Sequence, residues 1–427
     1  MSSVGVSKLA ISGGSPAVTL EHQPWPIAGD LEARWMDEVV RSGPWSWVGP
    51  HERAFCEEFA RFIGARHAMG LSNGTVTIQT ALQAVGVRPG DEVIVPGLTW
   101  VATMQAALDI GASVVLVDID PETWGIDPAA AEAAITERTR AIVPVHLYGC
   151  MVDMDAIMDL ARRYDLKVVE DCAHQHGSRW RDRGAGSIGD AGSFSFQQSK
   201  ILTSGEGGAI TCNDDEVYRT AFALKHVGWA PTADGEGLEA GGVYAHNYRT
   251  TEMQCVLLRG GLTRIEEQSR IRGENVARLT EGLARIGGPL RVARRDPRIT
   301  RQAYYAVTMH FDPAQADGVD RAHYVAALAA EGVGIGVPYY PVYRHPLMNL
   351  QHPTSPIPFR DPALTQDYAN LSLPNVERTC GETGAVMSHK SLLSEPEYID
   401  QLIEGVAKVN DRLEAVREHF AAQEATE

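Results

Sequence analysis

Two alternating patterns of hydrophobic residues run from residue 51 to about residue 212. Short apolar runs are separated by stretches in which apolar side chains recur every three or four positions, as in residues 51–64, 127–135 and 154–164. The short runs predict buried strands, and the longer stretches predict amphipathic helices. The strands are expected at residues 93–96, 113–119, 141–147, 166–170, 192–196 and 208–212. This alternation predicts an α/β domain with a mostly parallel central sheet flanked by helices.

The segments on either side of this region have different patterns. The first fifty residues are rich in glycine, proline and tryptophan and are expected to form an irregular arm. Residues 251–286 show a long, charged helical pattern that suits a connector between domains. Strands expected at 303–311 and 334–338, with helices expected at 321–331 and 395–422, predict a smaller α+β domain. The predicted division is an N-terminal arm over 1–50, a large domain over 51–260 and a small C-terminal domain over 261–427.

Charge and cysteine content narrow the classes of protein that fit. The chain has 427 residues and a formal net charge of −17, whereas a nucleic-acid-binding protein usually presents a basic face. The six cysteines are scattered without metal-ligand spacing, so we expect reduced cysteines and no metal site. No stretch resembles a signal peptide or a membrane span. These features predict a soluble, cytoplasmic protein that binds neither nucleic acid nor membrane.

Two of the predicted strands are followed by residues that could carry chemistry. Lys200 comes after the strand at 192–196 and before the glycine-rich residues 205–208, which let the backbone approach a ligand closely. A lysine with a lowered pKa forms imines with carbonyl compounds, although a lysine at a strand end is otherwise a solvated surface residue. Asp171 follows the strand at 166–170, where a carboxylate could keep a pyridine nitrogen protonated or could cap a helix.

Three further residues fit a phosphate-bearing aromatic ligand. Gly74 and Thr75 stand at the expected start of a helix, where free N–H groups and a hydroxyl can bind phosphate, although these residues are also ordinary helix caps. Trp100 follows the first predicted strand and could stack on an aromatic ring or belong to the core. The order of phosphate cradle, stacking aromatic, carboxylate and lysine is the order found in fold-type-I pyridoxal enzymes.

The chain resembles the DegT/DnrJ/StrS family of sugar and cyclitol aminotransferases over nearly its whole length, starting at residues 13–16. The motifs that carry the resemblance are Gly-Asp-Glu-Val-Ile-Val-Pro at 90–96, Pro-Val-His-Leu-Tyr-Gly at 144–149, Glu-Asp-Cys-Ala-His at 170–174, Gly-Asp-Ala-Gly-Ser-Phe-Ser-Phe at 189–196 and Gly-Glu-Gly-Gly at 205–208. The resemblance implies a fold-type-I, aspartate-aminotransferase-like transferase. It further implies pyridoxal 5′-phosphate as cofactor, pyridoxamine 5′-phosphate as its intermediate form, and a homodimer with shared active sites.

The resemblance also implies roles for individual residues. Lys200 matches the catalytic lysine that holds the cofactor as a Schiff base, and Asp171 matches the partner of the pyridine nitrogen. The other residues that match ligands of the cofactor ring or phosphate are Gly74, Thr75, Trp100, His174, Ser195 and Asn247. Among these, His174 matches a residue that hydrogen-bonds the phenolic oxygen. Asn247 matches an asparagine that one subunit contributes to the phosphate of the other.

Finer features of the sequence indicate the substrate class. The Phe-Ser-Phe-Gln pattern ending at Gln197 is similar to the branch that includes glutamine:scyllo-inosose and 2-deoxy-scyllo-inosose aminotransferases. This branch implies L-glutamine as amino donor and a free keto-cyclitol as acceptor in aminocyclitol antibiotic biosynthesis. Tyr339, Tyr343 and His389 are expected substrate contacts, although Tyr339-Tyr340-Pro341 stands where many members have His-Tyr before proline. A nucleotide-linked keto-sugar as acceptor, an amino-hydroxybenzoate-synthase-like enzyme and a non-catalytic regulator are the alternatives.

Overall fold

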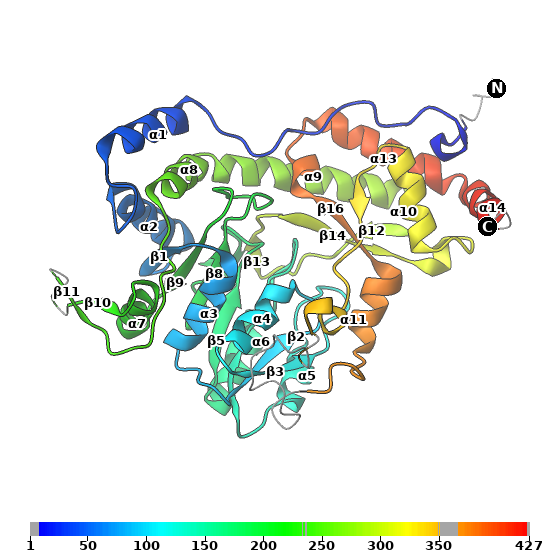
Figure 1. The fold of residues 1–427 in the computed structure, drawn as a ribbon. Helices are drawn as coiled ribbons and strands as arrows, with labels where there is room; N and C mark the ends of the chain where they lie inside the picture. The colour runs from blue at the N-terminus through cyan, green and yellow to red at the C-terminus, as the bar shows by residue number, and fades with distance from the viewer. Residues whose placement is uncertain (1–7, 233, 235–236, 349, 351–365, 425–427) are drawn as a thin grey trace.

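Two main β-sheets organise the molecule (Figure 1). The computed structural model describes residues 8–232, 234, 237–348, 350 and 366–424. Within these residues one sheet has seven strands and a hydrophobic core on each face, and the other has four strands and a separate core.

The seven-stranded sheet is mostly parallel, as the alternating sequence pattern predicts. Its order is β1, β9, β8, β5, β4, β2, β3, and β9 runs antiparallel to both of its neighbours. The strands are β1 (His67–Leu71), β2 (Glu92–Pro96), β3 (Ser113–Val117), β4 (Thr139–Ile142), β5 (Lys167–Asp171), β8 (Ala191–Ser195) and β9 (Gly208–Cys212). Six of them coincide with predicted strands, which confirms the α/β fold. The edge strand β1 is missed because its Ala and Gly residues give no apolar run.

Helices cover both faces of this sheet. On one face lie α3 (Gly74–Ala84) and α4 (Val101–Asp109), and on the other lie α2 (Pro50–Ile63), α6 (Met154–Tyr164) and α8 (Glu252–Leu262). Successive side chains of a strand point to opposite faces, so each central strand contributes apolar residues to both cores. This double burial explains why the strands appear in the sequence as unbroken apolar runs.

The C-terminal part of the chain forms the four-stranded antiparallel sheet, in the order β12, β14, β16, β15. Its strands are β12 (Leu290–Val292), β14 (Ala306–Phe311), β15 (Ile335–Gly336) and β16 (Gly384–Ser388). The helices that complete this core are α9 (Ile265–Ile286), α10 (Arg321–Ala330), α13 (Pro396–Asn410) and α14 (Leu413–Glu424). In the part of the chain described here, none of the helices has both the length and the apolar composition of a membrane span.

Three predicted segments differ from the structure. Residues 251–286 form two helices, because α8 ends after Gly260 and Gly261 and the chain turns at Thr263 before α9 begins. The predicted helix over 395–422 is similarly divided into α13 and α14. The first fifty residues are not wholly irregular, since they contain the amphipathic helix α1 (Asp30–Ser42), which packs against α8.

Residues 8–29 run past the helices α13 and α9 before the chain reaches α1 (Figure 1). Leu9 and Val18 are buried in the core of the four-stranded sheet. The carboxylate of Glu331 accepts the N–H groups of Ala10 and Ala17 at 2.7 and 3.0 Å. The arm is therefore tied into the C-terminal core at one end and to the large sheet's helices at the other.

Candidate active site

A cavity of about 410 Å³ opens at the carboxyl ends of strands β5 and β8. Parallel sheets usually bind their ligands at this edge. The polar and aromatic side chains that line it include Thr75, Trp100, Thr103, Asp171, His174, Ser195, Lys200, Glu206, Tyr305 and Tyr339. Most come from loops after the large sheet's strands, and Tyr305 and Tyr339 come from the C-terminal region. The structure therefore brings most of the predicted site residues to one place.

Lys200 reaches the cavity from the loop that follows β8. Burial lowers the pKa of its amine to about 8, because desolvation disfavours the ammonium form, and the opposing attraction of Asp171 is smaller. Its Nζ atom lies 4.7 Å from the centre of the Tyr305 ring. A lysine with this pKa is partly neutral near pH 8 and can therefore act as a nucleophile or base.

Asp171 ends strand β5, and 5% of its surface is exposed. One carboxylate oxygen accepts the Ala173 N–H at 3.1 Å, and the other accepts the Thr103 hydroxyl at 2.8 Å. The hydroxyls of Thr103 and Thr99 are 2.8 Å apart, so Thr103 is itself held in place. Desolvation raises the pKa of Asp171, with these hydrogen bonds opposing the rise. A positive partner at the cavity would restore the usual preference for the ionised form.

The hydrogen bonds of His174 define which of its nitrogens can donate. Its Nδ1 atom accepts the N–H of Tyr148 at 3.1 Å, so the proton of the neutral ring is on Nε2. Burial holds the pKa of His174 well below its ordinary value, which keeps the ring neutral. His174 therefore offers the cavity a hydrogen-bond donor, as a ligand with a phenolic oxygen would require.

The N-terminus of α3 forms the anion-binding side of the cavity. Asn73 caps the helix by accepting the N–H of Val76, and the N–H groups of Gly74 and Thr75 have no hydrogen-bond acceptor among the described residues. A Cβ atom on residue 74 would lie only 2.7 Å from the Cβ of Ser195, so glycine is required there. Free N–H groups at a helix start favour a phosphate.

Trp100 forms an outer wall of the cavity together with Tyr339. Their ring centres are 5.3 Å apart, and 53% of the Trp100 surface is exposed. An indole in this position is available to stack on a planar ligand. Its exposure rules out the alternative that Trp100 belongs to the core.

Three predicted site residues lie outside the cavity lining. Tyr343 is buried with its hydroxyl 3.1 Å from a carboxylate oxygen of Glu377. His389 lies behind the Lys200 loop, where its Nε2 atom donates to the Ser199 carbonyl at 2.9 Å. Asn247 lies in the segment that follows the hairpin of β10 (Trp229–Pro231) and β11 (Leu238–Ala240) and forms a bridge with His226.

Sequence reasoning missed Thr103, Tyr148 and Tyr305. Thr103 stands four residues after Thr99, the spacing that puts two side chains on one helical face, so that signal was available. Tyr148 lies inside the predicted family motif at 144–149, but its ring was not assigned a role. Tyr305 gave no signal, because its place depends on how the C-terminal sheet packs against the Lys200 loop.

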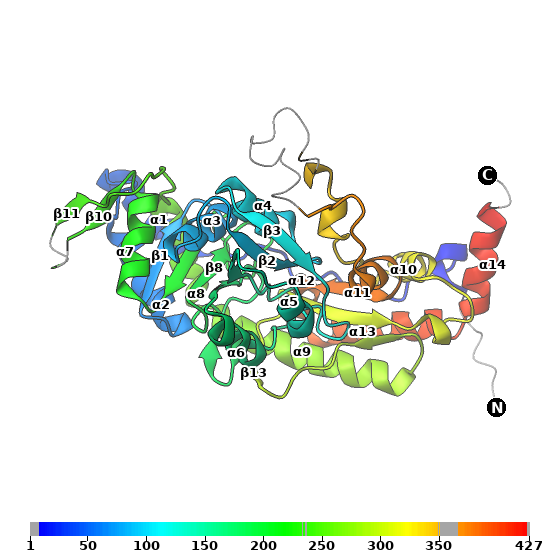
Figure 2. The same ribbon diagram turned by 90° about the horizontal axis from the view of Figure 1, so that it is seen from below.

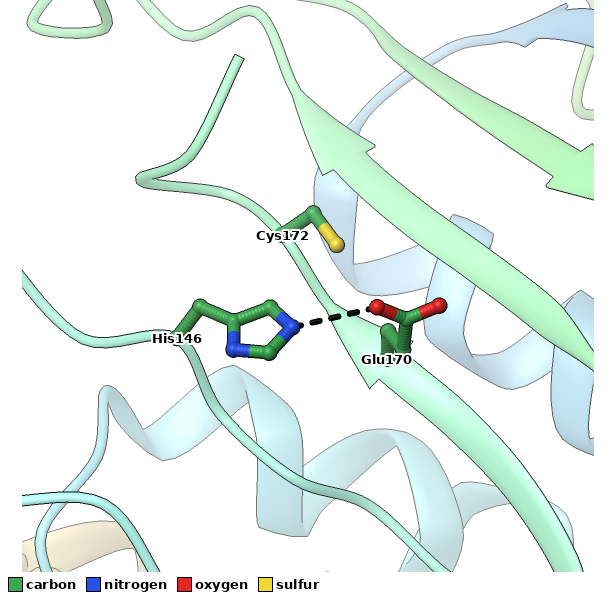
Figure 3. A group of neighbouring side chains, drawn as sticks. All are labelled: His146, Glu170 and Cys172. Atoms are coloured by element: carbon green, nitrogen blue, oxygen red, sulfur yellow. Dashed lines mark hydrogen bonds and ion pairs between the residues drawn. The ribbon is translucent and has the colours of Figure 1, made fainter. Parts of the chain in front are cut away.

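A second buried polar group consists of Glu170, Cys172 and His146, the last of which also lines the cavity (Figure 3). Glu170 accepts the N–H groups of Gly186, Ile188 and Gly189, and His146 Nε2 lies 3.1 Å from its carboxylate. His146 Nδ1 accepts the N–H of Val152, so both ring nitrogens are used. Although burial would raise the pKa of Glu170, these hydrogen bonds lower it. Glu170 and His146 therefore hold residues 186–189 and Val152 against the end of β5.

Comparisons with known proteins agree with this geometry. The profile of the DegT/DnrJ/EryC1/StrS aminotransferase family matches residues 27–393. A relative from Streptoalloteichus tenebrarius, provisionally named L-glutamine:3-amino-2,3-dideoxy-scyllo-inosose aminotransferase, is 42% identical over 96% of this chain and 100% of its own length. L-glutamine:2-deoxy-scyllo-inosose aminotransferase from Micromonospora echinospora is 37% identical over 94% of this chain and 97% of its own. The crystal structure of 3-amino-5-hydroxybenzoic acid synthase is 30% identical with a TM-score of 0.80, covering 92% of this chain and 99% of that one. The chain therefore belongs to the DegT/DnrJ/EryC1/StrS aminotransferase family.

Proposed function

We propose that this aminotransferase binds pyridoxal 5′-phosphate in the cavity and uses Lys200 as its catalytic lysine. The observation that carries the proposal is that one buried cavity joins the Lys200 amine, the Asp171 carboxylate and the free N–H groups at the start of α3. The N-terminus of α3 with Ser195 would hold the phosphate, and Asp171 would hold the pyridine nitrogen. His174 would donate its Nε2 proton to the phenolic oxygen, and Trp100 would stack on the ring.

The residues of the chain then perform a proton transfer. When bound, pyridoxal phosphate supplies a ring that withdraws electrons from the donor's α-carbon and stabilises the negative charge left when its proton departs. Asp171 keeps the ring nitrogen protonated through its buried carboxylate. Lys200, whose pKa of about 8 leaves a neutral fraction near pH 8, removes the proton with Nζ and later returns it. The amino group is thereby carried from the donor to a ketone in two half-reactions.

We propose L-glutamine as the donor and a free keto-cyclitol, such as scyllo-inosose or its 2-deoxy derivative, as the acceptor in aminocyclitol biosynthesis. Curated relatives with these donors and acceptors in their names cover nearly the whole chain. Three relatives that match nearly the whole chain at 38–42% identity are named for a ketone that already carries one amino group. That aminated ketone therefore belongs among the acceptors to be tested.

The charge of the cavity supports an acceptor without a nucleotide. Among the described residues that line it, Lys200 is the single cationic side chain, whereas Asp171 and Glu206 are acidic. A nucleotide diphosphate is normally bound by several arginine or lysine side chains. Arg344 is engaged elsewhere, because its guanidinium donates to the carbonyls of Ala369 and Leu371.

A homodimer with shared active sites is part of the proposal. Near Asn247 the chain exposes Trp45, Trp47, Val227, Trp229 and Tyr244, between 45% and 86% of each. The neighbouring hairpin of β10 (Trp229–Pro231) and β11 (Leu238–Ala240) projects from the body of the molecule (Figures 1 and 2). His226 is buried beside Trp47 with neither ring nitrogen bonded within the described chain. An aromatic surface of this kind is typical of a subunit interface.

The test is an assay of the purified enzyme with L-glutamine and four ketones. The acceptors are scyllo-inosose, 2-deoxy-scyllo-inosose, 3-amino-2,3-dideoxy-scyllo-inosose and a keto-sugar nucleotide, and amine formation is followed by mass spectrometry. We expect kcat/KM to be highest for one of the cyclitols. A higher kcat/KM for the sugar nucleotide would contradict the proposed cyclitol acceptor. Absence of an amine product with all four ketones would contradict both the cyclitol and the sugar-nucleotide alternative.

A second candidate is an aromatising reaction of the kind named for 3-amino-5-hydroxybenzoic acid synthase. The structural similarity to that enzyme, at a TM-score of 0.80, favours it. The higher identity of 36–42% to the scyllo-inosose aminotransferases makes the cyclitol our first choice. An aromatic product would be detected by its ultraviolet absorbance, which an aminocyclitol lacks.

A further inference from the structure

The ring of Tyr305 contacts two residues of the proposed active site, His174 and Lys200. Its ring stacks on His174 with centres 3.9 Å apart and planes 13° apart. The Nζ atom of Lys200 lies 4.7 Å from the centre of the same ring. No hydrogen bond or ion pair involves Lys200 Nζ among the described residues, so the ring of Tyr305 is its close contact.

The Tyr305 hydroxyl connects the loop of Lys200 to the C-terminal region. It lies 3.2 Å from the hydroxyl of Ser199, the residue before the lysine. It also lies near the side chain of Tyr339, which lines the same cavity. Tyr305 is thus held through its ring and its hydroxyl at once.

The backbone of Tyr305 is fixed by the four-stranded sheet. Strand β14 begins at the next residue, and the Tyr305 carbonyl accepts the N–H of His389 at 3.0 Å. The position of the ring is therefore set by the C-terminal core and not by the loop that carries Lys200.

We propose that Tyr305 is a positioning residue for Lys200. The face of the Tyr305 ring holds the Lys200 amine whenever that amine is not bonded to the cofactor. The inference rests on the proposed role of Lys200 in transamination. In that cycle the lysine must be released and must stay within reach of the reacting carbon. The negative face of an aromatic ring attracts an ammonium group without forming a bond that must later be broken. The Tyr305 hydroxyl acts separately, because its hydrogen bond with Ser199 holds the ring in place.

The ring and the hydroxyl can be tested separately with two variants. Tyr305→Phe retains the ring and loses the hydroxyl, whereas Tyr305→Leu loses both. Tyr340→Leu is the matched control, because Tyr340 is 51% exposed and does not line the cavity. Should Tyr305→Leu fail to fold, Tyr305→Met removes the ring with a longer, more flexible side chain.

The measurement is the pH dependence of acetylation of Lys200, read by peptide mass spectrometry on the full chain saturated with pyridoxamine 5′-phosphate. In this form Lys200 is free without any amino donor. The titratable groups around Lys200 include Asp171, His174, His176, Glu206, Tyr305, Tyr339 and His389. Tyr340→Leu retains all of these groups, and Tyr305→Phe removes the Tyr305 hydroxyl but retains its ring. A change in the apparent pKa of Lys200 that occurs in Tyr305→Leu alone is therefore due to loss of the ring.

We expect an apparent pKa near 8 in the wild type, in Tyr305→Phe and in Tyr340→Leu. In Tyr305→Leu it should fall by about one pH unit, because the ammonium form loses its stabilising contact. An unchanged or higher value in Tyr305→Leu would overturn the inference. Failure of the wild type to bind pyridoxamine 5′-phosphate would instead count against the proposed function, and the acetylation profiles would still compare the ring and ringless variants.

Discussion

Replacing Asp171 with asparagine separates the electrostatic role of this residue from its structural role. Both carboxylate oxygens already accept a hydrogen bond, one from Ala173 and one from Thr103. An asparagine can keep the Ala173 bond with its amide oxygen and can donate to Thr103, which is able to turn its own proton toward Thr99. The structural cost of Asp171→Asn should therefore be small, on the order of 1 kcal/mol or less.

The catalytic cost should be much larger. Two unit charges about 4 Å apart interact by about 4 kcal/mol at an effective dielectric constant of about 20. If Asp171 no longer holds a protonated ring nitrogen, the proton-transfer step should slow by on the order of 10³-fold. The assay is single-turnover conversion of the bound cofactor by L-glutamine, followed by absorbance. Asp165→Asn is the control, since Asp165 is in a left-handed turn that asparagine also tolerates.

Stability measurements distinguish this prediction from simple misfolding. Burial raises the pKa of Asp171 in the folded chain, against the opposing hydrogen bonds. A carboxyl group with a higher pKa in the folded state costs stability as the pH rises from its unfolded pKa through its folded pKa. In the absence of added cofactor, Asp171→Asn should therefore unfold at no lower urea concentration than the wild type at pH 7. The difference should disappear below about pH 4. A rate loss below tenfold, or a clear loss of stability at pH 7, would refute the reasoning.

Four further outcomes are expected. Lys200→Ala should lose turnover and the visible absorbance of lysine-bound cofactor, and normal turnover would contradict its assignment. Gly74→Ala should weaken cofactor binding at least tenfold in an equilibrium titration, because the added Cβ would clash with Ser195. The control Gly273→Ala has open space for the added Cβ and should leave cofactor affinity unchanged. Equal affinities of the two variants would exclude a phosphate site at α3. Co-expressed Lys200→Ala and Asn247→Ala chains should recover about a quarter of wild-type activity. The reason is that about half of the dimers are mixed, and one of the two sites in each mixed dimer is intact if Asn247 contributes to the site of its partner. No recovery would mean that both residues act in the site of their own subunit. In the half-reaction that starts from pyridoxamine 5′-phosphate, the rate should rise with pH through about 8 as Lys200 loses its proton, and a rate that falls over this range would contradict a neutral lysine.

The sequence alone predicts the parts of the site that follow buried parallel strands. Asp171 and Lys200 could be found because apolar runs mark β5 and β8, and such strands end at a common edge of the sheet. Gly74 and Thr75 could be found because helix caps have a local signature. These residues depend on short-range patterns, which a single sequence contains.

Residues that depend on packing between distant segments could not be placed in this way. Tyr305 and Tyr343 are both tyrosines of the C-terminal region, but one lines the cavity and the other is buried against Glu377. The difference depends on how each tyrosine packs against distant parts of the chain and not on the neighbours of either residue in sequence. The division of residues 251–286 into α8 and α9 is similar, because a charged helical pattern continues through the turn.

The attachment of the N-terminal arm has a consequence for the order of events during synthesis. Ala10 and Ala17 leave the ribosome before their partner Glu331, which lies more than 300 residues later, and Lys408, which pairs with the same carboxylate, is later still. The core that buries Leu9 and Val18 therefore cannot form until almost the whole chain has been synthesised. Closing such a long loop is slow, and the waiting apolar residues are exposed to wrong partners. We expect productive folding of this enzyme in cells to depend on chaperones that protect the nascent N-terminus.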